Sequence, residues 1–403
     1  MNPLTDYATG IVHQARQEAR RGELFAKVLS ANDDAGRHGV LIPTEAYSFF
    51  PDFHIADASE NSTVEFRAFD AVNNTECVLA YKYYQRYPER RVTRLPSLIN
   101  DRAGDPRIVV FLRIVHADGS SGYYVDSGAS GTGGRFESLF SAAFLPETEP
   151  QPGTYISRPL DATPFTADES LVDLLARFDD VKDMGWVQSL RTGDTGIGYT
   201  FESLLGIEEN NDRRADYRGI ELKCKALREG SGFAKGKINL FQQGPTWTDG
   251  ATTAQRIRIF GRQQANGQWT CNSQITTSAN NRGALLSIVE ASEKIRLMRV
   301  HDEHGYWLFS KLEERLREKH SRAAIIKARV RDSNGSQQFK YDEFIYCERP
   351  SIDKFITLVR NRNIVFEFLM KEQASGPRNR GYPWRLVREE FLDQLYSFQI
   401  KLR

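Results

Sequence analysis

The stretch that decides the fold is Thr195–Ala226, TGIGYTFESLLGIEENNDRRADYRGIELKCKA. Its end, IELKCKAL, alternates between apolar and charged residues, which is typical of a strand with one buried face. Residues two apart on a strand point to the same face, so we expect Glu221 and Lys223 to project together while Leu222 faces the core. Asp216 lies just before this strand, where a turn would bring its carboxylate beside Glu221.

This carboxylate–lysine cluster predicts a metal site. Two adjacent carboxylates repel one another unless a cation lies between them, and Mg²⁺ prefers oxygen ligands while leaving positions for water and phosphate. Asp216 and Glu221 are the predicted ligands, and Lys223 would orient or deprotonate the attacking water and offset the charge on phosphorus. Glu202, on a predicted amphipathic helix, would add a further carboxylate. The alternative is an exposed strand edge with ordinary surface ion pairs, because so short a pattern also arises by chance.

The segment resembles the catalytic motif of the MvaI/BcnI group of Type II restriction endonucleases. These enzymes are relatives of the mismatch-repair nicking enzyme MutH and share the PD-(D/E)XK nuclease fold. The similar stretches are Gly198–Gly206, Ala215–Lys223 and the strand KINLFQ (Lys237–Gln242). The resemblance implies a supporting acid, two metal ligands and a catalytic lysine, in that order: Glu202, Asp216, Glu221 and Lys223.

The resemblance also implies an activity. It predicts a monomeric Type II enzyme that hydrolyses double-stranded DNA with Mg²⁺ at a short CCWGG-like site, beside a cognate DNA methyltransferase of the same restriction-modification system. Two alternatives stay open: a sequence-specific DNA-binding protein without catalysis, and a MutH-like repair nickase that works with a partner.

A basic segment near the carboxyl end, SGPRNRGYPWRL (Ser375–Leu386), is bounded by Gly and Pro and predicts a loop. Arg can pair bidentately with guanine, and Asn with adenine, in the major groove. The MvaI/BcnI group carries base-reading residues in a comparable late loop before a final helix. The alternative is a solvated loop that contacts phosphates or nothing. The candidate DNA-binding residues are Arg378, Asn379, Arg380 and Arg385.

The segment Phe144–Phe165 separates two parts of different composition. It carries five prolines and little periodicity, which predicts a semi-stiff linker at 146–165. Residues 1–145 are expected to form one helix, about Asp6–Ser30, and then short strands, as in a barrel or sandwich. Residues 166–403 are expected to form a mixed α/β domain.

The expected elements follow from periodicity and from turn residues. In the first part, strands are expected at 39–43, 62–70, 76–84, 91–95, 107–115 and 122–126. In the second part, helices are expected at 169–181, 198–207, 308–320, 351–362 and 387–398. Strands of the second part are expected at 218–227, 237–242, 323–332, 339–349 and 363–370.

Two segments of the first part mix basic residues with aromatic or Gly-rich sequence, namely Asn32–Pro43 and Ala80–Leu95. Such a mixture suits a nucleic-acid face, although surface arginines on a strand–turn–strand are an equal alternative. Their order is similar to the EcoRII amino-terminal effector domain, a pseudobarrel shared with plant B-three transcription factors, over about 25–145. The resemblance implies a Type IIE layout, in which this domain binds a second copy of the site. Its candidate DNA-binding residues are Arg37, His38, Lys82, Arg86, Arg90 and Arg91.

The charge balance agrees with a DNA enzyme better than with a histone-like protein. The 403 residues carry 54 Lys+Arg and 53 Asp+Glu, a formal charge of +1. Residues 1–150 hold 15 Lys+Arg against 20 Asp+Glu, a net −5, which leaves +6 for 151–403. Four scattered cysteines, no secretory signal and no run of 18 apolar residues predict a cytoplasmic protein without a membrane partner.

Overall fold

The structure is a computed structural model of the 403-residue chain. It describes residues 21–33, 39–51, 60–86, 89–95, 106–115, 121–131, 134–146, 148–160, 167–193, 195–207, 215–227, 237–333, 336–388 and 391–403. These residues form two compact units. The first unit contains 1–182, 342–347 and 397–403, and the second contains 183–341 and 348–396.

This division differs from the one expected at 146–165, which stays a proposal. The first unit includes a helix, α3 (Glu169–Asp183), up to Lys182, as well as the last residues of the chain. The segment expected to be a linker contains a strand, β8 (Tyr155–Pro159), whose Tyr155 and Ile156 are buried. Proline disfavours helix and leaves the chain extended, so a segment rich in proline can still pair at a sheet edge.

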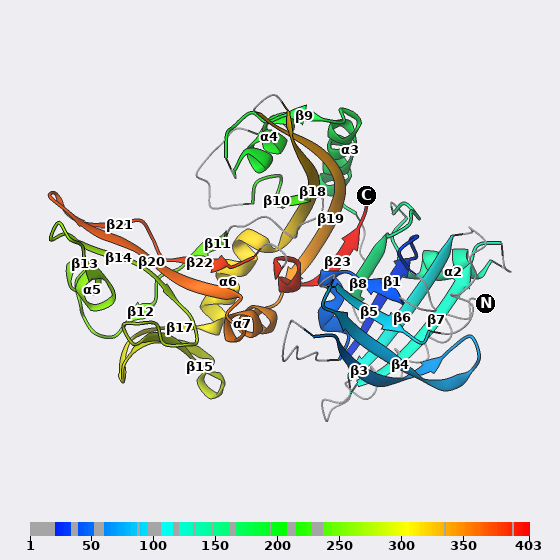
Figure 1. Ribbon diagram of the computed structural model, residues 1–403, viewed down its shortest axis with the longest axis horizontal. Helices are drawn as coiled ribbons and strands as arrows, with labels where there is room; N and C mark the ends of the chain where they lie inside the picture. The colour runs from blue at the N-terminus through cyan, green and yellow to red at the C-terminus, as the bar shows by residue number, and fades with distance from the viewer. Residues whose placement is uncertain are drawn as a thin grey trace. The chain divides into compact units, whose positions relative to one another are not determined.

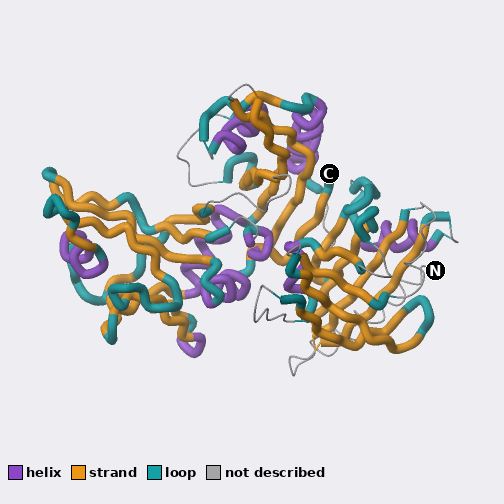
Figure 2. The backbone as a smooth tube through the Cα atoms, viewed as in Figure 1, coloured by secondary structure: helices purple, strands orange, loops and turns teal. Residues whose placement is uncertain are grey.

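The first unit is a strand-rich layer in which neighbouring strands follow the order β23-β8-β1-β6-β7-β3-β4-β5-β2. Figure 1 shows β8, β1, β6 and β7 side by side, and Figure 2 shows how little helix accompanies them. Pairing is antiparallel except between β3 and β7. This β-rich unit is consistent with the expected pseudobarrel. Its elements are β1 (Arg21–Val28), β2 (Val40–Ile42), η1 (Thr44–Phe49), β3 (Ser62–Asp70), β4 (Thr75–Tyr84), β5 (Glu89–Thr93), β6 (Arg107–Val115), β7 (Ser121–Ala129), α2 (Arg135–Ala143), β8, α3 and most of β23 (Tyr396–Lys401).

The core of the first unit is a cluster of aromatic rings. Phe50 lies at its centre, with its ring centroid 5.0 Å from that of Tyr81, 5.4 Å from Phe111 and 5.9 Å from Phe25. All four side chains are almost fully buried. Aromatic rings bury large areas and prefer tilted contacts of this kind, so they hold β1, β4 and β6 around the short helix η1.

The second unit is a mixed α/β fold. In it β10 (Glu221–Leu227) pairs in parallel with β18 (Arg322–Ser333), and β18 neighbours β19 (Ser336–Pro350), of which residues 342–347 belong to the first unit. A second sheet has the order β11-β22-β20-β14-β13, with β21 on β20, and a third has the order β12-β17-β16-β15. The remaining elements are β9 (Val187–Gln188), α4 (Gly196–Leu204), β11 (Ile238–Gln242), β12 (Thr246–Trp247), α5 (Thr253–Phe260), β13 (Arg262–Gln263), β14 (Trp269–Ile275), β15 (Ala284–Val289), η3 (Glu290–Ser292), β16 (Lys294–Arg299), β17 (Asp302–Leu308), α6 (Phe309–His320), α7 (Ile352–Arg360), β20 (Ile364–Gln373), β21 (Gly376–Asn379), β22 (Pro383–Leu386) and η5 (Asp393–Leu395).

Two expected helices are wrong where the structure describes them. The expected helix Asp6–Ser30 lies partly outside the described residues, but its end forms β1, which pairs with β6 and β8. The expected helix 387–398 is a short 3-10 turn, η5, followed by β23, which also pairs with β8. In both segments a partner strand distant in sequence overrides a helical spacing of apolar residues.

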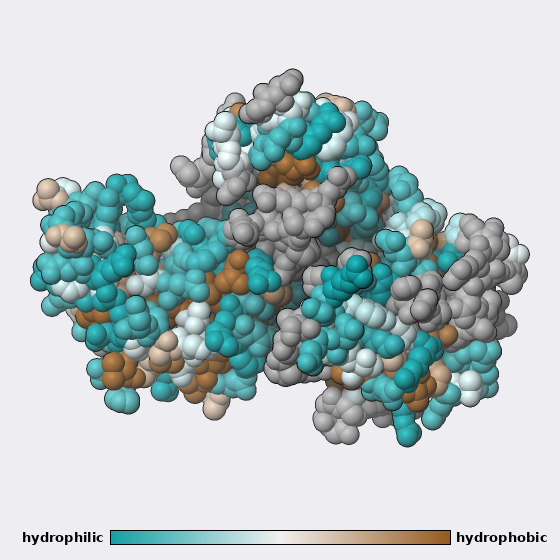
Figure 3. Space-filling view, viewed as in Figure 1, coloured by the Kyte–Doolittle hydropathy of each residue, from teal (hydrophilic) through white to brown (hydrophobic). Residues whose placement is uncertain are grey.

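The surface of the described residues is mainly polar on the face drawn in Figure 3. Hydrophilic residues predominate there, and the apolar areas are small and scattered. None of the described helices is both long enough and apolar enough to cross a membrane.

A buried ion pair connects β1 to β2 in the first unit. Lys27 Nζ donates to Asp33 Oδ1 at 2.8 Å and to the carbonyl of Leu41 at 2.7 Å. Asp33 in turn accepts from the amides of Ser30 and Leu41 at 2.8 and 2.7 Å. Burial lowers the pKa of Lys27, although Asp33 acts in the opposite direction. Removing one partner would therefore leave an uncompensated buried charge.

We expect Asp33→Ala to destabilise the first unit by about 3–5 kcal/mol, because Lys27 would remain buried and unpaired. All five tryptophans lie in the second unit, so tryptophan fluorescence during urea unfolding reports on that unit alone. Hydrogen exchange measured on β1 and β2 peptides should accelerate while the fluorescence transition keeps its midpoint.

The control is Glu65→Gln, which breaks an exposed ion pair with Arg94 (2.7 Å) in the same unit. Exposed pairs contribute about 1 kcal/mol or less, so this variant should exchange like the parent chain. Equal exchange in Asp33→Ala and Glu65→Gln would contradict the stabilising role of the buried pair.

Candidate active site

A tight turn places the first predicted carboxylate. Tyr217 and Ile220 exchange two backbone hydrogen bonds of 2.9 and 2.7 Å. The two residues between them both have positive φ, and the second is Gly219 (φ 86°). Two positive φ values in a two-residue turn are typical of a type I′ hairpin. Asp216 stands directly before it, and its Oδ2 accepts from the amide of Leu222 at 3.0 Å. The turn thus brings Asp216 to the beginning of β10.

The second predicted carboxylate is fully buried. Glu221, the first residue of β10, has an exposed fraction of 0%. Its Oε1 accepts from Lys223 Nζ, two residues along the same strand. Its Oε2 lies 3.3 Å from Lys319 Nζ but has no hydrogen-bond partner among the described residues. Lys319 thus compensates the charge of this oxygen without a hydrogen bond, so Oε2 keeps lone pairs that a metal ion can accept.

Electrostatics link these groups into one cluster. Burial and the neighbouring Glu221 raise the pKa of Asp216 above its ordinary value. Burial alone would lower the pKa of Lys223, but Glu221, Asp216 and, more weakly, Glu202 together raise it. The ammonium of Lys223 is therefore stabilised in its charged form by the carboxylates around it.

Glu202 lies on α4, a helix that packs against β10. Phe201 anchors this helix, since its buried ring lies 5.0 Å from that of Tyr341, whose hydroxyl donates to the carbonyl of Ile197 at 2.8 Å. The structure thus brings together the four predicted catalytic residues, with Glu202 near enough to influence the pKa of Lys223.

Sequence reasoning missed two neighbours of this cluster. Lys319 and His320 end α6, and they follow Glu221 by many residues. Lys319 reaches Glu221, whereas His320 is fully buried, with Nε2 3.1 Å from the carbonyl of Leu240 and Nδ1 3.2 Å from the hydroxyl of Tyr396. Burial and the nearby Lys223 lower the pKa of His320 to about 3. A basic last helical turn was visible in the sequence, but nothing in it indicated that this turn meets β10.

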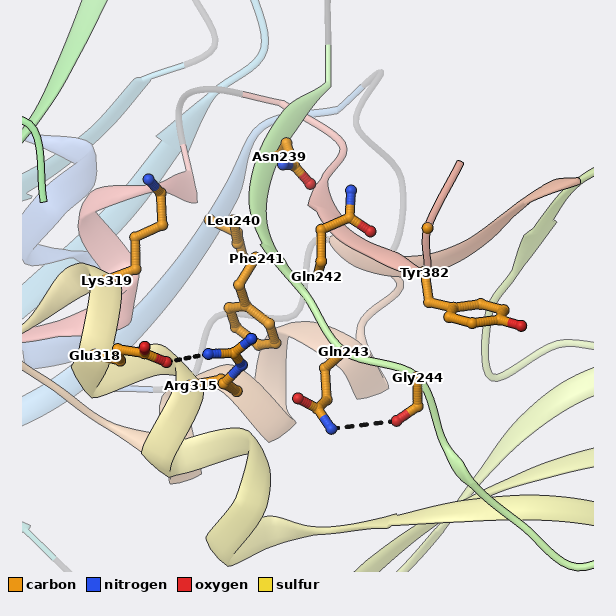
Figure 4. A pocket seen from close by; sticks show the side chains of 11 residues that line it. Asn239, Leu240, Phe241, Gln242, Gln243, Gly244, Arg315, Glu318, Lys319 and Tyr382 are labelled. Carbon is orange, nitrogen blue, oxygen red and sulfur yellow. Dashed lines mark hydrogen bonds and ion pairs between the residues drawn. The ribbon is translucent and has the colours of Figure 1, made fainter. Parts of the chain in front are cut away.

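A cleft of about 470 Å³ lies within the second unit, and its lining includes Lys319, which pairs with Glu221. Its lining comes from β11, from the end of α6 and from the segment between β21 and β22. Figure 4 shows Lys319, Glu318 and Arg315 on one side of β11 and the side chain of Tyr382 on the other. Ammonium, guanidinium and amide groups suit a polyanionic ligand with polar edges.

The predicted basic loop is a pair of short strands rather than a loop. Arg378 and Asn379 lie on β21, which pairs with β20, and Arg380 follows it. All three side chains are exposed, although Asn379 Oδ1 accepts from the amide of Gly381 at 2.8 Å. Pairing with the long strand β20 extends the segment on both sides of Arg380–Tyr382.

Arg385 is set apart from those three residues. It lies on β22, half-buried, with Nε 3.4 Å from Oε2 of Glu367 on β20. Glu367 also pairs with Lys237, the residue before β11. This ion-pair group connects β20, β22 and the start of β11. Arg385 therefore helps to hold these strands together, in addition to its predicted contact with DNA.

The predicted basic patch of the first unit divides between two faces. Cross-strand pairing places Lys82 opposite Arg91, and Tyr83 opposite Arg90. Because side chains alternate along a strand, Arg90 and Arg91 point to opposite faces. Arg91 is buried and donates to the carbonyls of Asn32 (2.7 Å) and Gly39 (3.1 Å), so it supports the adjacent segment.

The remaining predicted DNA-binding residues of the first unit lie in different surroundings. Arg90 places its guanidinium 4.2 Å from the ring centroid of Tyr47. Arg86 lies exposed in the turn after β4, and Arg37 and His38 lie outside the described residues.

The described residues contain no group of three or more His, Cys, Asp or Glu side chains that could hold a metal ion. Two carboxylates are nevertheless enough for Mg²⁺, which usually keeps several waters and uses substrate phosphates as ligands. The donor set at Asp216 and Glu221 therefore fits a hard divalent cation.

Comparison with known proteins identifies the family of the chain. The model of the MvaI/BcnI restriction endonuclease family matches residues 175–396, which is more than half of the chain. The chain belongs to the MvaI/BcnI restriction endonuclease family. It is a Type II restriction endonuclease, a site-specific deoxyribonuclease, and membership favours this function over the non-catalytic alternative. The curated proteins contain no match.

Three solved structures are similar to this family member. The B3 domain of UbaLAI restriction endonuclease, solved with cognate DNA, is 53% identical, covering 39% of this chain and 99% of that domain, with a TM-score of 0.35. MvaI with its cognate DNA substrate is 24% identical over 58% of this chain and 99% of that one (TM-score 0.48). MvaI without DNA is 22% identical over 59% and 100% (TM-score 0.41). The TM-scores lie below 0.5, so the relation to UbaLAI rests on sequence identity alone. This identity confirms the expected layout, in which a B3-type domain accompanies an MvaI/BcnI nuclease.

Lys319 is expected to contribute to cleavage by this restriction endonuclease. Replacing it with Met removes a cation that faces both Glu221 and the cleft, so we expect the cleavage rate constant on plasmid DNA to fall by about 100-fold. Lys319→Arg should retain more activity, because it keeps the charge. Single-turnover cleavage with excess enzyme measures the effect apart from binding.

Lys311→Met is the matched control, since Lys311 lies on the same helix and pairs with Glu314 in solvent at 2.8 Å. It should cleave like the parent enzyme. Equal rates for Lys311→Met and Lys319→Met would show that Lys319 has no part in the reaction.

Proposed function

We propose that this restriction endonuclease is a Mg²⁺-dependent Type IIE enzyme that cuts double-stranded DNA at a CCWGG-like site. The observation that carries the catalytic part is the buried carboxylate of Glu221, with Asp216 beside it and a lysine at each of its oxygens. A merely structural ion pair would gain nothing from a second carboxylate beside the buried Glu221, because the two negative charges repel one another.

Asp216 and Glu221 would hold the metal. Oε2 of Glu221 supports this assignment, since it is buried without a hydrogen-bond donor among the described residues. Bound there, Mg²⁺ would supply electrostatic stabilisation of the charge that develops on the phosphate oxygens. The amide of Leu222 fixes the orientation of Asp216, so this ligand needs little reorganisation.

The lysines would act on the substrate from two directions. Lys223 extends from β10 beside Glu221, where its ammonium can orient a water and offset negative charge at phosphorus. Lys319 extends from α6 into the cleft, where it can contact the DNA backbone. Glu202 on α4 would support Lys223 through its negative charge.

The direct test is Asp216→Asn on supercoiled plasmid DNA with Mg²⁺. The change keeps the size of the side chain and removes its charge, so the cleavage rate should fall by at least about 1000-fold while DNA binding persists. Gel electrophoresis reads nicked and linear products, and EDTA should abolish cleavage by the parent chain.

The product also decides between a restriction enzyme and a MutH-like nickase. A restriction enzyme alone yields linear DNA, whereas a nickase stops at the nicked circle or requires a partner. Cleavage by Asp216→Asn at the parent rate would refute the assigned site.

The first unit would bind a second copy of the recognition site as an effector. This proposal is supported by the identity with the UbaLAI B3 domain, which was solved with cognate DNA. A second DNA-binding module raises the local concentration of the catalytic module at the site without any new contact in the active site. Arg37, His38, Lys82, Arg86 and Arg90 remain the candidate contacts.

A comparison of plasmids with one and two copies of the mapped site tests the effector role. We expect the two-site plasmid to be cut about tenfold faster at limiting enzyme, and a short duplex carrying the site to stimulate cutting of the one-site plasmid in trans. A scrambled duplex is the control. Equal rates on both plasmids, without stimulation, would exclude a Type IIE mechanism and leave the nuclease assignment intact.

The proposal also covers where the enzyme acts, its oligomeric state and its partner enzyme. The enzyme would act in the cytoplasm as a monomer, cutting one strand and then the other. A cognate DNA methyltransferase of the same system would protect the host site.

A further inference from the structure

Strand β11 presents two amide side chains to the cleft. Asn239 and Gln242 are exposed, whereas Leu240 and Phe241 between them are buried. Both amides line the cleft that also contains Lys319. Neither side chain forms a hydrogen bond with another described residue, although each offers one acceptor and two donors.

A β-bulge accounts for this arrangement. Residues three apart on a regular strand point to opposite faces. Against β22, however, Asn239 pairs with Arg385 and Phe241 pairs with Trp384, so the register shifts at Leu240. The extra residue turns the following side chains over, which brings Gln242 to the same side as Asn239. Figure 4 shows the two amides on one side of the strand and inclined toward one another.

Two contacts hold the bulge in place. The carbonyl of Leu240, the unpaired residue, lies 3.1 Å from Nε2 of His320, which is buried at the end of α6. With the hydroxyl of Tyr396 3.2 Å from Nδ1, the neutral ring can donate to Leu240 and accept from Tyr396. Gly381 (φ 111°) lies against the amide of Gln242, where a Cβ would clash with it. The absence of a side chain at Gly381 therefore leaves space for the amide of Gln242.

We propose that Asn239 and Gln242 are specificity-determining residues that read the edges of base pairs next to the scissile phosphate. An amide carries a donor and an acceptor at the spacing of adenine N7 and N6, so an A·T pair in the major groove is the expected partner. Neutral amides neutralise no phosphate, and the cations Lys319 and Arg315 lie across β11 from them. Charge and base reading are thereby separated within one cleft. This inference rests on the proposed function, in which the second unit binds and cuts duplex DNA.

The test uses the full-length enzyme and a library of duplexes with eight randomised base pairs. One portion is digested with Mg²⁺ and the cut ends are sequenced, and the other portion is selected by binding without added metal. Gln242→Leu and Asn239→Leu should each relax the preference at one base-pair position. On the preferred duplex, kcat/KM should fall by about 10- to 100-fold. Gln242→Glu should move the preference from adenine toward cytosine, whose amino group donates to a carboxylate.

Gln243→Leu is the matched control, because the neighbouring amide of Gln243 is already bonded to the carbonyl of Gly244 at 3.3 Å. It should keep the parental preference. An unchanged preference at all eight positions in the Asn239 and Gln242 variants would overturn the inference, as would a uniform loss of activity on all sequences. Circular dichroism and tryptophan fluorescence confirm folding. The first unit is the same in every variant, so a change in the bound sequences relative to the parent chain reports on the second unit even if the parent chain does not cleave. Failure of the proposed function and failure of this inference are therefore distinguishable.

Discussion

The burial of the Glu221 carboxylate is the constraint on which the candidate active site depends. A carboxylate without solvent costs several kcal/mol unless cations compensate it, and the described structure supplies two. Lys223 comes from the same strand, so its contact follows from local geometry, whereas Lys319 comes from the end of α6 and requires that helix to dock correctly. The charge of Glu221 is thus balanced only in the folded unit, where Oε2 pairs with Lys319 but accepts no hydrogen bond from the described residues.

Two consecutive residues of α6 therefore connect the chemistry to the DNA-facing strand. Lys319 contacts Glu221 on β10, and His320 contacts the bulged Leu240 on β11. Because consecutive helical residues differ by about 100° in direction, a single helix end can support both strands at once. The buried imidazole has its pKa lowered to about 3, so it stays neutral and its hydrogen bonds keep the same direction at ordinary pH.

The parts of the site that are local in sequence could be predicted from it. The strand β10, the turn after Asp216 and the helix with Glu202 each depend on residues close together in the chain, and the structure contains all three elements. The expectation of one buried face on β10 is wrong, because Glu221 and Lys225 of the charged face are also buried. Lys319 could not be predicted, because its role depends on docking between distant segments. The same reason explains β1 and β23, whose helical spacing is overridden by pairing with distant strands. The sheet of β15, β16 and β17 was not anticipated either.

Strand alternation also limits what a cluster of basic residues can indicate. Arg90 and Arg91 are neighbours in sequence, yet one stacks on Tyr47 while the other is buried and bonded to backbone carbonyls. A run of arginines on a strand therefore contributes only about half its members to either face. Likewise Arg385 is separated from Arg378 by its ion pair with Glu367. The net charge of a segment consequently overstates its contacts with DNA, and specificity can depend on neutral amides that no count of charge detects.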